Sequence, residues 1–320
     1  MMKLFKKLLI LALVLLLIGG VTFTVAFAAA GFNFDKISGI KTSYTTFEEA
    51  DGVTASKVNL KIKSSDVYLK FDDKAEKVSI TYPEQTNKNG DKLASTILSE
   101  TDGIISAVEK IDVKNGLFLW NFTTSRVEVT IPQSRQLDLL IETDTGDVII
   151  DGKGTLTSLL IETDTGDVKA KKSSITVAGK FSLETDTGDA VLGEINASSL
   201  EVEVDTGDVT FGNCNVLQSI SVTSDTGDIR FGGAIVCETL KCDIDTGDVD
   251  GENATIDAKS ITIETDTGDV ELRLTGKSDD YETFVTTRTG NSNIASHKGS
   301  PRTLTFKTAT GDIEVYFTEK

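Results

Sequence analysis

Hydrophobic and polar residues alternate along most of the chain, in short runs that return about every 20 residues around a Thr-Gly pair. Before Gly146, apolar residues stand seven and five positions upstream, at Leu139 and Ile141; after it they stand two and four positions downstream, at Val148 and Ile150. Successive side chains of a strand point to opposite faces. Each run therefore predicts two strands with one buried face each, joined by a tight turn, and the chain reads as all-β.

The unit recurs nine times, with steps of 19 to 22 residues between its glycines, which are Gly146, Gly166, Gly188, Gly207, Gly227, Gly247, Gly268 and the weaker Gly290 and Gly311. A fixed period of this size on strand-like segments indicates a solenoid. The leucine and asparagine pattern of leucine-rich repeats is missing. We expect a single-stranded parallel β-helix, a β-solenoid of about nine coils with right-handed coiling by default. Two or three sheets per coil both fit, and nine coils would form a rod roughly 40 Å long.

The pattern divides the chain into three parts. Residues 1–36 read as an N-terminal membrane anchor or signal segment, residues 37–136 as a degenerate β entrance and cap, and residues 137–320 as the regular solenoid with C-terminal closing coils. Within the entrance we expect a worn repeat around Asp66 and an exposed loop from Pro83 to Lys92. Stacks of strands need protected ends, and two segments are expected to supply them: the aromatic run Phe118, Trp120 and Phe122, and the final "TLTFKTATGDIEVYFTEK".

The first segment has three lysines, Lys3, Lys6 and Lys7, followed by an uncharged stretch over residues 8–33. About 25 apolar residues suffice to span a bilayer and exceed a signal-peptide core. The "AFA" at residues 26–28 resembles a signal-peptidase site, so a cleaved signal is the alternative. We expect one transmembrane helix, contact with the cell membrane through residues 8–32, and the bulk of the chain outside the cell.

Charge narrows the choice of partners. The chain carries a net charge of -18, and residues 137–275 hold 29 acidic against 9 basic residues. Such a surface repels nucleic acid and anionic headgroups, so we expect no nucleic-acid binding and favour cell-wall or protein partners with basic surfaces. Cys214, Cys237 and Cys242 form no C-x-x-C pair, and we expect them to be small buried hydrophobes.

The N-terminal anchor, the run "VEVTIPQSRQLDLLIETDTGDV" and the successive "TDTGDV" coils resemble the bacterial putative-adhesin family of β-strand-repeat proteins of unknown function. The resemblance extends from about Val58 to Phe317. It implies a parallel β-helix outside a bacterial cell, of the Gram-positive kind, sometimes associated with envelope stress. It brings no catalytic residues to this chain.

The acidic corners admit two interpretations. Like charges about 5 Å apart repel by roughly 1 kcal/mol in water, so something must offset the stacking. In the first interpretation the carboxylates accept hydrogen bonds from turn N–H groups. In the second, adjacent coils pair their carboxylates in a weak Ca²⁺ ladder, which would use Asp144, Asp147, Asp164, Asp167, Asp186, Asp189, Asp205 and Asp208. No dedicated cofactor is expected.

The threonine that begins each "TDT" is replaced by Val204 and Ile244 in two coils. We therefore expect this position to face the core, which argues against an ice-binding threonine face. The only histidine, His297, lies in a predicted loop, and neither a catalytic triad nor a phosphate-binding loop occurs. The sequence favours a non-enzymatic structural or adhesive surface module. The alternatives are an envelope-stress sensor or accessory protein that binds cationic peptides or a protein partner, and a Ca²⁺-dependent carbohydrate-active enzyme.

Overall fold

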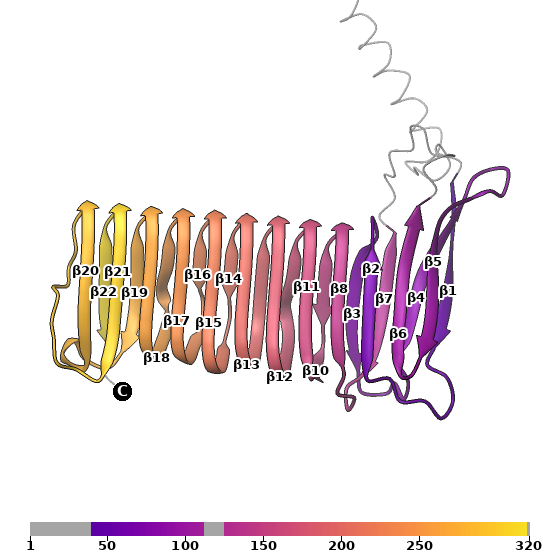
Figure 1. The fold of residues 1–320 in the computed structure, drawn as a ribbon, viewed down its shortest axis with the longest axis horizontal. Helices are drawn as coiled ribbons and strands as arrows, with labels where there is room; N and C mark the ends of the chain where they lie inside the picture. Colours follow the sequence, from indigo (N-terminus) through magenta and orange to yellow (C-terminus); the bar gives the residue numbers. More distant parts are fainter. Residues whose placement is uncertain (1–39, 112–124, 319–320) are drawn as a thin grey trace, which may run out of the picture.

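The computed structural model describes residues 40–111 and 125–318, which form a long rod of stacked β-coils (Figure 1). The strands lie side by side across the rod, so its length is the direction of backbone hydrogen bonding. One short 3-10 helix, η2 (Ser278–Asp280), is the only helical element among the described residues. The all-β solenoid predicted from the sequence is confirmed.

The entrance strands are β1 (Lys41–Glu48), β2 (Lys57–Ile62), β3 (Asp66–Asp72), β4 (Ser79–Thr86), β5 (Lys92–Thr101), β6 (Ile104–Ile111) and β7 (Arg126–Pro132). The repeat strands are β8 (Asp138–Thr145), β9 (Val148–Asp151), β10 (Lys153–Leu156), β11 (Ser158–Thr165), β12 (Val168–Thr187), β13 (Ala190–Thr206), β14 (Val209–Phe211), β15 (Cys214–Thr226), β16 (Ile229–Phe231), β17 (Ala234–Thr246), β18 (Val249–Thr267), β19 (Val270–Thr275), β20 (Tyr281–Thr289), β21 (Arg302–Thr310) and β22 (Ile313–Thr318).

Each regular coil contributes three strand segments. β8, β9 and β10 make up one coil, and β11 begins the next in parallel register, with Leu139 beside Leu159 and Ile141 beside Ile161. In later coils the second and third segments run on into the next first segment, as in β12, where breaks in register separate three paired stretches. Three segments per coil answer the question that the period alone left open.

The alternation of apolar and polar residues in the sequence corresponds to an alternation of buried and exposed side chains in the strands. In the regular coils, the residues seven and five positions before the glycine and two and four positions after it are buried, and they form one core along the rod. Phe211 and Phe231 stack in successive coils with ring centroids 5.2 Å apart. The first threonine of "TDT" faces inward as predicted: Thr163 is 3% exposed, and Val204 occupies the same position in its coil. The three cysteines are also buried, in the thiol form.

Glycine at the first corner is required by the stacking itself. The corner glycines of the repeat have φ between 143° and 155°, a region that side chains disfavour. A Cβ placed on Gly207 would lie 2.1 Å from the carbonyl oxygen of Gly188 in the preceding coil. Each coil therefore approaches the one before it at a distance that only glycine allows.

At the C-terminal end, the order of the coils along the rod differs from their order in the sequence. β21 pairs with β18 on one side and with β20 on the other, and β22 pairs with β19. The last coil in the sequence thus lies between the Gly268 coil and β20, which is the outermost strand of the rod (Figure 1). The expectation that "TLTFKTATGDIEVYFTEK" closes the stack is wrong.

The hydrophobic pattern explains this reversal. Two and four residues after Gly311 stand Ile313 and Val315, which are buried, whereas the same positions after Gly290 are Ser292 and Ile294 in a loop. Without a second buried strand, the Gly290 unit cannot carry another coil on its far side. Eight of the nine predicted units are therefore complete coils, and the ninth is a terminal strand.

The N-terminal end repeats the same arrangement. The worn repeat around Asp66 is a coil: β2 and β3 stack directly on β8 and β9. Their other neighbours are β6 and β7, which come later in the sequence. The chain thus forms an inner coil, then an outer one, and then returns to begin the regular repeat. β4 pairs antiparallel with β1, β5 and β7, and so ends the parallel stack.

Some expectations about the entrance are corrected or fall outside the described residues. Pro83 is buried in β4, so the exposed loop is only the turn from Asn87 to Asp91, where the Asn87 side chain accepts bonds from Asn89 and Asp91 N–H groups. The predicted aromatic cover at Phe118, Trp120 and Phe122 and the predicted membrane segment lie outside the described residues. Among residues 40–111 and 125–318, no helix is long and apolar enough to cross a membrane.

Replacing one corner glycine should unfold the stack locally. In Gly207→Ala the new methyl group would meet the Gly188 carbonyl and adopt a disfavoured φ, and we expect a loss of about 3 kcal/mol or more in the free energy of unfolding. Chemical denaturation measures the loss. Gly232→Ala is the matched control, since its nearest contact would be 3.4 Å away; equal losses in both variants would contradict the stacking argument.

Removing residues 301–320 should disorder more than the removed coil. β21 separates β18 from β20, so the deletion leaves β20 without its only parallel partner. We expect amide hydrogens of residues 281–289 to exchange rapidly, while those of residues 158–206 remain protected. A chain that ends at Thr318 is the control. Persistent protection of residues 281–289 in the truncated chain would show that β20 can stack in the vacated place.

Candidate functional site

The aspartate after each corner glycine forms a hydrogen-bonded ladder along the rod. The Asp167 N–H donates to Asp147 Oδ1 at 3.0 Å, and the Asp189 N–H donates to Asp167 Oδ1 at 2.9 Å. The same bond joins successive coils through Asp66, Asp147, Asp167, Asp189, Asp208, Asp228, Asp248, Asp269 and Asp312, and it ends at the N–H of Asn291. These bonds join neighbouring coils; they do not close a turn within one coil.

The ladder explains why acid is tolerated at every corner. An N–H group left without a partner where the chain turns would be costly, and a bond from N–H to a charged acceptor contributes about 1.5 to 3 kcal/mol. Repulsion between exposed carboxylates 5 Å apart is about 1 kcal/mol. Hydrogen bonding therefore outweighs repulsion, and the corner aspartates are primarily structural.

Two cations strengthen the ladder from outside. Lys169 Nζ lies 2.8 Å from carboxylate oxygens of both Asp147 and Asp167, and Arg230 bridges Asp208 at 2.5 Å and Asp228 at 2.6 Å. The hydrogen bond from Lys169, together with the Asp189 N–H, lowers the pKa of Asp167 below its ordinary value. Arg230 is thus a surface ion-pair partner of aspartates on two successive coils.

The other acidic positions form two rows on the first strand of each coil, the half-buried or exposed glutamates that directly follow the core pair and the exposed aspartates in the middle of "TDT". The glutamate row runs from Glu142 through Glu162 and Glu184 to Glu203. Partial burial, and then the neighbouring carboxylates of Glu184 and Asp205, raise the pKa of Glu203. Repulsion is therefore present where no backbone bond offsets it.

Lysines close these acidic rows at the ends. At the N-terminal end, Lys61 lies 2.6 Å from Glu142 and Lys63 lies 3.0 Å from Asp144. At the other end, Lys307 lies 3.1 Å from Glu264. The rows are thus bounded by positive charge in the coils that flank the regular repeat.

The eight residues of the predicted calcium ladder separate into two kinds. Asp147, Asp167, Asp189 and Asp208 each use one oxygen to accept a backbone N–H group, and Asp144, Asp164, Asp186 and Asp205 are exposed. Among the described residues, no group of three or more His, Cys, Asp or Glu side chains is arranged to hold a metal ion. A weak Ca²⁺ ladder stays a prediction.

Two buried carboxylates in the entrance were not anticipated from the sequence. Glu109 accepts bonds from the N–H groups of Lys63 and Ser64 and from the Ser65 hydroxyl, at 2.7 to 2.8 Å. It therefore completes the corner between β2 and β3, where Ser65 stands in place of the repeat glycine. Glu49 pairs with Arg135 at 2.8 Å; hydrogen bonds from Ala55 and Arg135 outweigh its burial and lower the pKa of Glu49. Both residues hold the entrance together.

A shallow groove crosses the second strands near the entrance. One hollow of about 570 Å³ is lined by Tyr44, Asp66, Thr81, Arg126, Glu128 and Ile149. A second, of about 310 Å³, is lined by Tyr68, Ile149, Ile150, Asp151, Lys169, Lys171 and Lys172. Ile149 lines both hollows, which therefore lie next to each other. We call this surface the entrance groove.

The groove arises from one row of outward side chains. Glu128, Tyr68, Ile149 and Lys169 stand side by side on β7, β3, β9 and β12. The Arg126 guanidinium lies 4.7 Å from the centre of the Tyr68 ring, and the Tyr68 hydroxyl donates to Asp151 at 2.8 Å. Farther along the rod the row continues with Asp250, Glu271 and Glu314. The groove therefore occupies the part of the row in which Tyr68, Ile149 and Lys169 follow Glu128.

A sequence signal for the groove existed in the third residue after each repeat glycine. This position is Ile149 and Lys169 in the first two coils but acidic in three of the last four units, at Asp250, Glu271 and Glu314. The entrance residues of the groove come from strands that the period did not align.

His297 is exposed, and its backbone pairs with Thr283 at the outer edge of β20. Burial raises the pKa of the Cys214 and Cys237 thiols to about 12.

Comparison with known proteins gives a family. Residues 55–316 match the family model described as Toastrack DUF4097. None of the curated proteins matches the chain.

The chain is similar in fold to solved structures from Parabacteroides and Bacteroides species. A protein named as a putative lipid binding protein from Parabacteroides distasonis has 13% identity and a TM-score of 0.48, with 85% of this chain and 96% of that chain covered. A protein named as a putative adhesin from Bacteroides fragilis has 14% identity and a TM-score of 0.43, with coverage of 87% and 97%. A putative adhesin from Parabacteroides distasonis has 12% identity and a TM-score of 0.47, with coverage of 86% and 97%.

The two kinds of carboxylate should respond oppositely to pH. The pKa of Asp167 is lowered, so its contribution to stability is present above its unfolded pKa, near 4, and is lost as the pH falls through the folded value. Asp167→Asn should cost about 1 kcal/mol at pH 7 and nothing at strongly acidic pH. The pKa of Glu203 is raised, so Glu203→Gln should stabilise the protein at pH 7.

Urea denaturation of both variants and the parent chain across the acidic range measures these differences. Thr223→Ala, which alters the same exposed row without a change of charge, is the control. If the Asp167→Asn cost stayed constant with pH, or Glu203→Gln destabilised the protein at pH 7, the assignment of structural and repulsive carboxylates would be wrong.

Proposed function

The chain belongs to the Toastrack DUF4097 family, and we propose that it is a non-enzymatic adhesive module that a single N-terminal anchor holds at the outer face of a bacterial cell membrane. The observation that carries this proposal is the use of the repeated motif. Its glycine and one of its two aspartates serve the packing of coil on coil, so the repetition builds a rigid rod. A rigid rod that presents binding surfaces away from its anchor suits attachment.

The uncharged stretch of residues 8–33, with lysines before it, supports the anchor. On this proposal the entrance lies toward the membrane and the strand β20 toward the surroundings. The cell is of the Gram-positive kind, and the partners are wall components or proteins with basic surfaces that meet the acidic rows. The names of the structural neighbours, putative adhesins among them, agree with this direction.

Adhesion is tested with the full chain in its membrane. A Gram-positive host that produces the chain should retain more cells on immobilised cell-wall fragments than the same host without it, and surface protease should cleave the chain in intact cells. The matched control is the chain with Gly207→Ala, which keeps the anchor but disturbs the rod. Equal retention with and without the chain would contradict adhesion, and release of soluble sugar from the fragments by the purified full chain would contradict a non-enzymatic role.

A further inference from the structure

Basic residues gather at one place in an otherwise acidic rod. The segment 168–174, "VKAKKSS", contains three lysines and no acid, in a chain with 50 acidic and 32 basic residues. Lys153 precedes it by one coil, as the first residue of β10, two residues after the end of β9. Because β9 and β12 pair in parallel register, the residues that follow their second-strand segments lie at the same edge of the rod. Lys153, Lys171 and Lys172 are here called the lysine corner.

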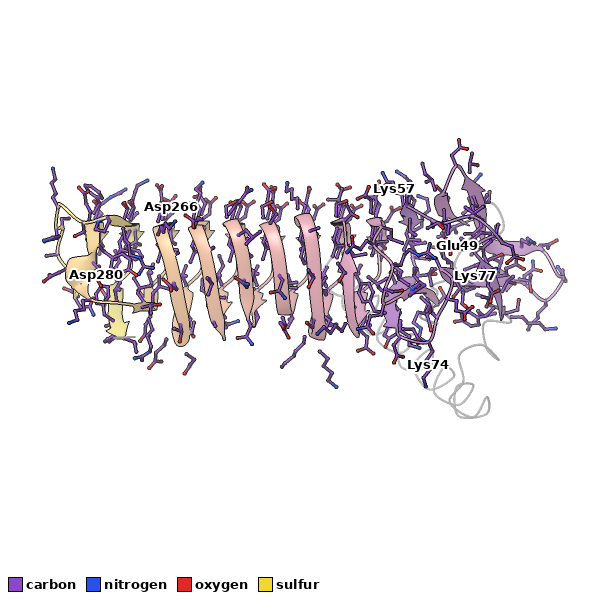
Figure 2. The ribbon with its side chains drawn as sticks, turned by 90° about the horizontal axis from the view of Figure 1, so that it is seen from below. Glu49, Lys57, Lys74, Lys77, Asp266 and Asp280 are labelled. Carbon is purple, nitrogen blue, oxygen red and sulfur yellow. The ribbon has the colours of Figure 1, made fainter. Side chains whose placement is uncertain are left out.

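The lysine corner is free of internal ion pairs. Lys169 is engaged by Asp147 and Asp167, but within the described residues Lys153, Lys171 and Lys172 make no salt bridge, and all three are exposed. The edge is also remote from the acidic rows: Lys74, which follows the neighbouring strand β3, projects from the edge opposite to Asp266 (Figure 2). Positive charge is thus available here without competition from those rows.

Beside these lysines lies the entrance groove. Lys171 and Lys172 line the hollow whose floor includes Ile149 and Ile150. From Ile149 the groove continues to Tyr44, which is 54% exposed, and to Glu128. An exposed tyrosine offers an apolar ring face and a hydroxyl, and carboxylates accept bonds from hydroxyl groups. The groove therefore combines an anion-binding end with a surface for rings that carry hydroxyls.

We propose that the entrance groove binds an anionic glycan, with the acidic groups of the glycan at Lys171 and Lys172 and its sugar rings along Ile149 toward Tyr44. The charge of the lysine corner selects a negative ligand. The carboxylates that line the groove, Asp66, Glu128 and Asp151, favour a chain that places its acidic groups at the lysine corner and its hydroxyls at the carboxylates over a flat anionic membrane, whose headgroups would meet those carboxylates as well.

Binding is tested by calorimetric titration of the full chain, solubilised in a nonionic detergent, with polygalacturonate as the anionic glycan. Dextran is the uncharged glycan, inorganic polyphosphate is the anion without sugar rings, and vesicles of equal parts phosphatidylglycerol and phosphatidylcholine represent the membrane. We expect binding of polygalacturonate that weakens with added salt, no binding of dextran, and weaker binding of polyphosphate and vesicles.

Two variants locate the site. Lys171→Glu with Lys172→Glu should weaken polygalacturonate binding at least about tenfold, whereas Lys259→Glu with Lys298→Glu, which changes the net charge equally at exposed lysines elsewhere, should leave it unchanged. Tyr44→Ser should weaken polygalacturonate binding and not polyphosphate binding. Thermal unfolding of each variant checks its fold.

Three results would overturn the proposal. Equal losses in the two double variants would mean that binding follows net charge. Tighter binding of vesicles than of polygalacturonate would assign the lysine corner to a membrane surface. Absence of polygalacturonate binding by the unaltered chain at low salt would remove the site. Adhesion to wall fragments can persist through any of these results, so this test and the test of adhesion are independent.

Discussion

The close approach of successive coils at the first corner is the constraint on which the rest of the rod depends. The carbonyl group of one corner glycine occupies the space where a Cβ of the next would stand, and this contact brings the following aspartate N–H within reach of the carboxylate in the coil before it. The register of all three strand segments follows from that pair of contacts. Apolar residues then fill the interior because their positions are counted from the same glycine.

The role of each carboxylate in this protein depends on whether it accepts a backbone N–H group. Aspartates that accept an N–H group from the next coil gain more from the bond than they lose by repulsion. Glu203 has no such partner, and partial burial, followed by the neighbouring carboxylates of Glu184 and Asp205, raises its pKa. The lysines at both ends of the rows pair with the terminal carboxylates and so bound each row. Lys169 and Arg230 each neutralise carboxylates on two coils at once.

The period, the buried positions and the inward threonine could be predicted from the sequence because each depends on contacts between equivalent positions of adjacent coils. The order of the end coils could not be predicted from the sequence. Each coil presents nearly the same surface to any neighbouring coil, so the repeat pattern does not indicate which coils stack on each other. Only the absence of buried residues after Gly290, at Ser292 and Ile294, carried that information. The entrance groove escaped prediction for a related reason: Tyr44, Tyr68 and Arg126 come from strands that are distant in sequence and meet only after folding.

At each end of the rod the order of the coils in space differs from their order in the sequence: β21 lies between β18 and β20, and β2 lies between β6 and β8. Each end of the rod is therefore a closed unit, and its assembly does not depend on the number of coils between the two ends. Duplication of one 20-residue unit would insert a coil that finds a glycine carbonyl below it and a glycine above it, and would lengthen the rod by about 5 Å. Repeated duplication of this kind would leave identical copies of the unit, as "ETDTGDV" at Glu142, Glu162 and Glu264. Evolution can therefore change the length of the rod, and with it the reach of the molecule from its base, in uniform steps.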